Sequence, residues 1–381
     1  MGLLKDVRRD PEVAAELARR VEDGRPYRLL DIKLYLTRRC NLRCIMCTAW
    51  AEEGDGRGEL STEEVMRIVA EAKPLGLANL KLFGGEPMLR RDLEAIVEHA
   101  AGLGIRCTLI TNGTLLTWQR AHSLLQAGLA QLDLSLDAGD PALHDHIRGV
   151  PGTWLRAVHG LQWLQEVTQT LDRRMVIRVN TVVMRQNYQG VPKLVSFLSD
   201  LHVHEIVLNP VVAQRENQRA AAPQYLLSRE EILQYNDEIV PRVLESAAAY
   251  KLSQDRDFLY LYGASEQDVE NAQQGRYVDR LQVRCCFKPW YYMVVRENGD
   301  VVGCNTVKHP LARIGNVREM SVDRIWHSET YRAFRARCHP PQFAECGRCC
   351  YHFALVNKQI GDVLAKGRRR PSGAFSAPGA N

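Results

Sequence analysis

Apolar, strand-like runs alternate with helix-like runs from about residue 29 to residue 212. Helices are predicted at residues 62–73, 91–103, 117–127, 153–167 and 191–200, and strands at residues 29–36, 78–83, 105–111, 131–136, 175–184 and 205–211. Six β-then-α units predict a parallel sheet covered by helices. Six units are fewer than the eight of a closed barrel, so the fold class we expect is α/β, with a partial (β/α)6 TIM-like barrel.

The segments before and after this repeat predict further structural units. Asn298-Gly299, between the apolar runs 291–296 and 300–303, predicts a β-hairpin, which we place with a helix in a small C-terminal domain. A long helix is predicted over residues 228–251. The predicted parts are a helical cap at 1–28, the barrel at 29–225, a helical linker at 226–283, the small domain at 284–366 and a disordered tail at 367–381.

Three closely spaced cysteines, Cys40, Cys44 and Cys47, follow the first predicted strand. Three thiolates can bind three irons of a [4Fe–4S] cube and leave the fourth iron open to a small molecule. A structural zinc site would want a fourth ligand, and no further Cys or His lies near this run. Ligands of open α/β sheets bind at the carboxyl ends of strands, which is where these cysteines are expected. We therefore interpret them as a catalytic iron site.

Further motifs follow the later predicted strands. Gly84-Gly85-Glu86-Pro87 follows the second strand and Thr111-Asn112-Gly113 the third. Ser135-x-Asp137 ends the fourth strand, and Asp145-His146-Ile147-Arg148-Gly149 comes soon after. With the cysteine run, this ordered series resembles the radical S-adenosylmethionine (SAM) superfamily over roughly residues 29–212. The resemblance implies a [4Fe–4S] cluster whose open iron binds SAM.

The resemblance also implies which residues contact SAM. Gly84 and Gly85 lack side chains, so the backbone can approach a ligand closely, and their carbonyls, with Glu86, suit the SAM ammonium. Arg148 suits the SAM carboxylate, because a guanidinium binds a carboxylate in a fork. Met46 stands where relatives often carry an aromatic residue. The expected SAM-binding residues are Met46, Gly84, Gly85, Glu86, Pro87, Thr111, Asn112, Ser135, Asp137, Arg148 and Asn180.

Seven more cysteines lie after residue 284. The spacing from Cys286 through Gly299 to Cys304 resembles the opening of the SPASM and twitch extensions of radical SAM enzymes, and Cys346-x2-Cys349 resembles their closing pair. No cysteine follows Cys350, so the resemblance favours a twitch-type domain with one auxiliary [4Fe–4S] cluster. The expected ligands are Cys286, Cys304, Cys346 and Cys349, with Cys285 and Cys350 as alternatives. A zinc site built from the same residues is the competing interpretation.

Three cysteines are spare under this assignment: Cys285, Cys338 and Cys350. Any of them is a candidate hydrogen-atom donor, which a radical epimerase would need. Each is otherwise an unused thiol. The candidates for substrate contact, by residue type alone, are Tyr260, Tyr262, Arg284, Lys288, Trp290 and Tyr291.

The resemblance implies reductive cleavage of SAM to methionine and a 5′-deoxyadenosyl radical, which takes a hydrogen atom from a substrate C–H bond. With an auxiliary cluster as electron acceptor, we expect a two-electron oxidation of a sugar-like or other small polar metabolite in natural-product biosynthesis. The alternatives are a peptide-modifying epimerase or crosslinking enzyme and, without catalysis, a cluster carrier. Only about 28 residues precede the first predicted strand, which favours the small substrate.

The composition is that of an ordinary globular chain of 381 residues with a net charge of +5. The small excess of positive charge gives no reason to expect a nucleic-acid partner. No apolar run approaches the ~20 residues of a spanning helix, and the N-terminus lacks the apolar core of a signal peptide, so we expect a cytoplasmic protein without membrane contact. The expected partners are the substrate and a flavodoxin- or ferredoxin-type reductant.

Overall fold

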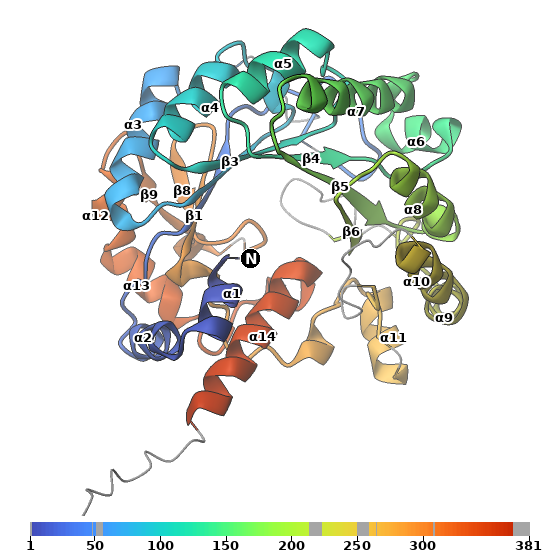
Figure 1. Ribbon diagram of the computed structural model, residues 1–381. Helices are drawn as coiled ribbons and strands as arrows, with labels where there is room; N and C mark the ends of the chain where they lie inside the picture. The colour runs from blue at the N-terminus through green and yellow to red at the C-terminus, as the bar shows by residue number, and fades with distance from the viewer. Residues whose placement is uncertain are drawn as a thin grey trace, which may run out of the picture.

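The computed structural model describes residues 2–47, 49–50, 56–212, 223–249, 259–263, 265–307 and 309–368. Its centre is a curved sheet in which the six predicted strands lie side by side in chain order, all parallel (Figure 1). They are β1 (Asp31–Tyr35), β2 (Asn79–Phe83), β3 (Arg106–Thr111), β4 (Gln131–Ser135), β5 (Val176–Val183) and β6 (Glu205–Pro210). The sheet does not close on itself. The predicted partial barrel is therefore confirmed.

Helices cover the outer face of this sheet (Figure 1). They are α3 (Thr62–Ala72), α4 (Leu93–Gly102), α5 (Trp118–Gln126), α6 (Pro141–Arg148), α7 (Thr153–Thr170) and α8 (Val191–Asp200). Ser61 and Glu64 form a capping box at the start of α3, where the side chain of each accepts a hydrogen bond from the backbone of the other. We did not predict α6, although Asp140 caps it and Pro141 opens it.

The C-terminal strands extend the barrel sheet instead of forming a sheet of their own. The predicted hairpin is confirmed, with β7 (Tyr292–Val295) and β8 (Asp300–Val302) antiparallel, followed by β9 (Arg313–Asn316). β7 pairs in parallel with β1, so the strand order is β6-β5-β4-β3-β2-β1-β7-β8-β9. Without β7, the backbone hydrogen-bonding groups along one side of β1 would have no strand partner.

The remaining helices precede β1 or follow β6 in the chain. They are α1 (Gly2–Arg9), α2 (Pro11–Glu22), α9 (Arg229–Gln234), a π-helical turn (Tyr235–Ile239), α10 (Val240–Ala249), α11 (Glu266–Gln273), α12 (Val322–Trp326), α13 (Glu329–Ala336) and α14 (Tyr351–Arg368). The helix predicted over 228–251 is thus α9, the π turn and α10, with its last two residues outside the described part. Helix α14 contacts α1, α2 and β6 across the open side of the barrel (Figure 1).

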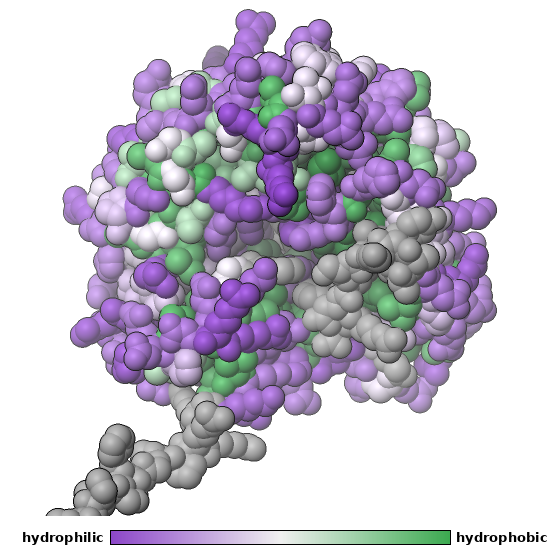
Figure 2. Space-filling model, in the orientation of Figure 1, coloured by the Kyte–Doolittle hydropathy of each residue, from purple (hydrophilic) through white to green (hydrophobic). Residues whose placement is uncertain are grey.

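The face of the molecule that is drawn in Figure 2 is hollowed at its centre, and many hydrophilic side chains border the hollow. Within the described residues, no helix has the length and apolar character needed to span a membrane. Residues 369–381 of the predicted tail lie outside the described residues, while Gly367 and Arg368 belong to α14.

Candidate active site

The three N-terminal cysteines line one pocket of about 210 Å³ at the carboxyl ends of the barrel strands. Met46, Gly84, Gly85, Thr111, Asn112, Ser135, Arg148 and Asn180 line the same pocket. The structure thus brings together eight of the eleven residues expected at the SAM site, from β3, β4, β5, the loops after β1 to β3, and the end of α6. Glu86, Pro87 and Asp137 are not among the lining residues, although all three are buried.

Gly84 and Gly85 are required by the approach of two loops. A Cβ atom on Gly85 would lie 2.2 Å from the carbonyl oxygen of Arg39, and one on Gly84 would lie 2.4 Å from that of Thr37. The backbone N–H groups of Gly85 and Glu86 donate hydrogen bonds to the same two carbonyls, at 2.8 Å each. The glycines therefore let the β2 loop dock directly on the cysteine loop, a reason that the motif alone did not show.

Glu86 connects the loops after β2 and β3. Its carboxylate accepts hydrogen bonds from the Thr111 hydroxyl at 2.7 Å and from the backbone N–H groups of Asn112 at 2.8 Å and Met88 at 3.0 Å. Burial raises the pKa of this carboxyl above its ordinary value, and these three donors oppose the increase. Glu86 thus positions the β3 loop, and its expected contact with the SAM ammonium stays a prediction.

Arg148 lies beside the cysteine loop at the end of α6. Its guanidinium forms an ion pair of 2.8 Å with Asp137, and a second nitrogen donates a long hydrogen bond of 3.9 Å to the Cys44 sulfur. Asp137 also accepts a hydrogen bond from the backbone of Val182, and its own backbone N–H donates to Nδ1 of the buried His144. Asp137 therefore holds the arginine in the pocket instead of lining it.

The donor set suits an iron–sulfur cluster. Burial raises the pKa of the Cys40 thiol to about 12 and also raises that of Cys44, which Arg148 only partly offsets. Burial thus favours neutral thiols in the protein alone, and a bound metal cation would keep them as thiolates. An open iron in this pocket would also face Arg148, a suitable partner for a carboxylate.

Sequence reasoning missed several residues of this pocket. Phe83, the last residue of β2, and Trp50 both line it, and the Trp50 ring nitrogen donates a hydrogen bond to the Cys44 carbonyl at 3.2 Å. Asn41 is hydrogen-bonded to both Asn112 and Thr114, which ties the cysteine loop to the β3 loop. The position of Phe83, directly before Gly84, was the one available signal for an aromatic wall.

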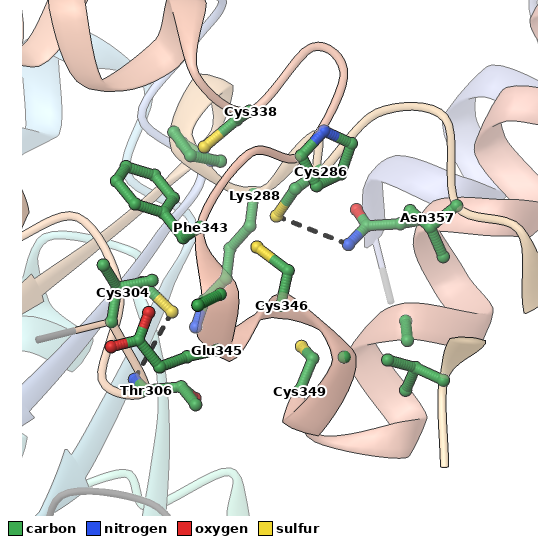
Figure 3. Close-up of a pocket in the computed structure, with 18 of the residues that line it drawn as sticks. Cys286, Lys288, Cys304, Thr306, Cys338, Phe343, Glu345, Cys346, Cys349 and Asn357 are labelled. Carbon is green, nitrogen blue, oxygen red and sulfur yellow. Dashed lines mark hydrogen bonds between the residues drawn. The ribbon is translucent and has the colours of Figure 1, made fainter. Parts of the chain in front are cut away.

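A second cysteine cluster lines a separate pocket of about 470 Å³ beside the hairpin (Figure 3). All four expected ligands, Cys286, Cys304, Cys346 and Cys349, line it, and Cys338 lines it as well. Cys285 and Cys350 are not among its lining residues. A hydrogen bond from Cys338 lowers the pKa of Cys286, while burial raises that of Cys349. Because Cys286 and Cys349 line the pocket and their neighbours in the chain do not, the geometry favours Cys286 over Cys285 and Cys349 over Cys350 as ligands.

The two adjacent cysteines point elsewhere. Cys285 is buried, and burial raises the pKa of its thiol. The Cys350 sulfur faces the barrel, where it donates a long hydrogen bond of 3.9 Å to Oδ1 of Asn209 on β6. Of the three candidate hydrogen-atom donors, Cys350 is thus hydrogen-bonded to a barrel strand, and Cys338 lines the second pocket.

Comparison with known proteins supports the interpretation of both pockets as iron–sulfur sites. The chain is 30% identical over 352 residues to the AdoMet-dependent heme synthase of Oleidesulfovibrio alaskensis, covering 89% of this chain and 84% of that protein. Residues 34–198 match the Radical SAM superfamily. The chain belongs to the radical SAM superfamily. Residues 285–350 of this radical SAM enzyme match SPASM, described as an iron–sulfur cluster-binding domain.

Two further relatives show the breadth of the superfamily. The PqqA peptide cyclase of Rhizobium meliloti is 28% identical over 318 residues, covering 82% of this chain and 77% of that protein. The crystal structure of Streptococcus suis SuiB bound to S-adenosylmethionine superposes with a TM-score of 0.64 at 18% identity, covering 89% of this chain and 76% of that chain. The fold and the expected cofactors, a SAM-binding [4Fe–4S] cluster, SAM and auxiliary iron–sulfur, are thereby confirmed.

Proposed function

We propose that this radical SAM enzyme is an oxidoreductase that removes two electrons from a small-molecule substrate. The observation that carries the proposal is the pairing of an open-sided three-cysteine pocket with a second pocket that offers five cysteines. Three ligands leave an iron for SAM, whereas four or five can complete the coordination of a second cluster, which suits electron transfer.

Within this proposal the protein residues have distinct tasks. Cys40, Cys44 and Cys47 hold the first cluster, and Arg148, fixed by Asp137, binds the SAM carboxylate. When bound, the first cluster and SAM supply a 5′-deoxyadenosyl radical that takes one hydrogen atom from the substrate. A second cluster would supply the acceptor for the second electron of the oxidation, and a base would take the accompanying proton. Cys286, Cys304, Cys346 and Cys349 hold that second cluster.

The names of the relatives give the substrate class to test first. Relatives that align over 84–88% of their own length are AdoMet-dependent heme synthases, and another is an Fe-coproporphyrin III synthase. These names support an iron tetrapyrrole ahead of the sugar-like metabolite expected from the sequence. The electron for SAM cleavage would come from a flavodoxin- or ferredoxin-type reductant, which dithionite can replace in a test.

The experiment is an anaerobic assay of the iron-loaded protein with dithionite and SAM. We expect 5′-deoxyadenosine to form, and to form faster when Fe-coproporphyrin III is added, with a modified tetrapyrrole appearing in equal amount. An Arg148→Ala variant should form at least tenfold less 5′-deoxyadenosine, because it loses the charged partner of the SAM carboxylate. A fully iron-loaded protein that forms no 5′-deoxyadenosine would refute the enzymatic proposal.

Peptide modification is the second candidate function. The peptide cyclase relative aligns over 82% of this chain, and the fold is also that of SuiB. The same assay separates the candidates, because stimulation by a peptide and not by tetrapyrroles would support the second one.

A further inference from the structure

Lys288 is a buried cation in the wall of the second cysteine pocket. It begins the 3₁₀ turn Lys288–Trp290, two residues after Cys286, and only 8% of its surface is exposed. Its side chain lines the same cavity as the cysteines (Figure 3). A buried ammonium normally requires a compensating negative group.

The neighbours of Lys288 within the described residues do not include an ion-paired carboxylate. Its ammonium instead lies over two aromatic rings, 4.5 Å from the Tyr292 centroid and 4.3 Å from the Phe353 centroid. The other charges in the pocket wall are Arg276 and Asp279, which pair with each other at 2.6 Å, and Glu345. Besides Asp279, which pairs with Arg276, the negative groups in this wall are thus Glu345 and the cysteines, once these are deprotonated by a bound metal.

The charge of Lys288 acts on these sulfurs. Lys288 lines the same cavity as Cys286 and Cys349, so its positive charge acts on any group that these sulfurs hold. Two neutral donors add to this effect, since the Asn357 amide lies 3.6 Å from the Cys286 sulfur and the Thr306 backbone N–H lies 3.4 Å from the Cys304 sulfur. The pocket thus combines one cation with hydrogen bonds to sulfur, two factors that set the potential of an iron–sulfur cluster.

We infer that Lys288 raises the reduction potential of the auxiliary cluster, so that the cluster accepts an electron more readily. Reduction adds one negative charge to a group already bound by thiolates, and a buried cation stabilises the more negative form. The attraction is strong because the pocket wall has a low effective dielectric. The inference rests on the auxiliary cluster and not on the proposed substrate.

The test is a redox titration of the holoenzyme followed by electron paramagnetic resonance. The first cluster is recognised because its signal changes when SAM is added, so the other signal reports the auxiliary cluster. Lys288→Met keeps most of the side-chain volume and removes the charge. We expect it to lower the auxiliary midpoint potential by at least about 59 mV, equivalent to about tenfold in the one-electron equilibrium constant.

Three further variants separate charge from packing. Lys288→Arg should keep the potential near that of the parent, and Glu345→Gln, which removes a negative charge from the same wall, should raise it. Lys358→Met, on the exposed side of α14, should leave it unchanged. An unchanged potential in Lys288→Met, or an equal decrease in Lys288→Arg, would overturn the inference.

The iron content of each variant shows whether the auxiliary cluster is still bound. If Lys288→Met loses the auxiliary iron, Lys288→Gln replaces it as the neutral variant. Loss of that iron from both neutral variants but not from Lys288→Arg would also support a charge effect. Loss from all three would assign Lys288 a packing role and overturn the inference. None of these readouts requires substrate turnover, so failure here differs from failure of the 5′-deoxyadenosine assay.

Discussion

Gly85 illustrates how single residues shape the SAM pocket. The chain must pass so close to the Arg39 carbonyl that a methyl group does not fit, and the contact is with backbone, which cannot rotate away. The residues beside it act mainly on one another: Glu86 holds the β3 loop and Asp137 holds Arg148. At the residue scale, the motifs therefore combine ligand contacts with contacts that hold the loops in place.

Replacing Gly85 by alanine should displace the β2 loop from the cysteine loop. We expect a loss of about 1–3 kcal/mol in the free energy of unfolding, typical of overpacking, together with weaker SAM binding. Gly102→Ala is the matched control, because no atom lies within 4 Å of the new Cβ at the end of α4, and alanine favours helix. Denaturant unfolding and SAM titration measure both variants. Equal stability of the two variants would contradict the close-approach argument.

Adjacent cysteines allow a sharp test of the auxiliary ligands. We expect Cys286→Ala and Cys349→Ala to reduce the auxiliary iron, because these side chains line the pocket, whereas Cys285→Ala and Cys350→Ala should keep it. Iron per chain and the auxiliary resonance signal are the measurements. A loss of iron from Cys285→Ala with retention in Cys286→Ala would reverse the assignment.

Helix α14 is the element that connects the second pocket to the rest of the molecule. It contacts α1, α2 and β6, and its buried Asn357 accepts a hydrogen bond from the backbone of Phe287 while its amide faces the Cys286 sulfur. Tyr292 of β7 packs edge-to-face on Phe353 of the same helix at 5.6 Å. The helix therefore supports the wall of the pocket from the side of the barrel opening.

Asn357→Leu should weaken this wall while leaving the helix intact. It removes the acceptor of the Phe287 N–H group, and an unpaired buried donor costs about 1–3 kcal/mol. We expect lower stability and faster loss of auxiliary iron to a chelator, with the first cluster unaffected. Lys358→Met, one residue along on the exposed face, should match the parent in both measurements. If both variants lose iron equally, α14 has no specific role at the pocket.

At the element scale, the strands could be predicted well because buried parallel strands are short apolar runs between turn signals. The helix α6 was missed, and α11 lies in the predicted helical linker without having been placed there as a separate helix, since each has only eight residues and too few turns for a clear periodic pattern. The pairing of β7 with β1 joins residues about 260 apart in the sequence, and no local pattern encodes such a partner.

In the whole molecule, the first cysteine pocket lies at the ends of the barrel strands and the second lies at the end of β8 of the same continuous sheet. Tyr35, at the end of β1, connects their surroundings: its hydroxyl accepts a hydrogen bond of 2.9 Å from Asn305, next to Cys304, and its ring packs on Phe83 at 4.9 Å. The pockets nevertheless share none of their lining residues. Each cluster should therefore assemble on its own ligands.

A Cys40/Cys44/Cys47 triple alanine variant tests this independence. The parent should hold about eight irons, from two four-iron clusters, and the variant about four. It should form no 5′-deoxyadenosine and keep the auxiliary resonance signal. Circular dichroism provides the folding control. A folded variant that lost all of its iron would show that the second pocket does not hold a cluster by itself.

The sequence by itself determined the parallel barrel, the superfamily, the three cysteines of the first pocket and the region of the second cysteine cluster, because strand patterns and closely spaced ligands are local features. Only the tertiary structure decided between Cys286 and Cys285 as pocket residues, joined Glu86 to the β3 loop and Asp137 to Arg148, and placed Lys288 in the wall of the second pocket. These outcomes depend on which way a side chain points and on what a distant segment places beside it, and neither is written in the spacing of residues along a chain.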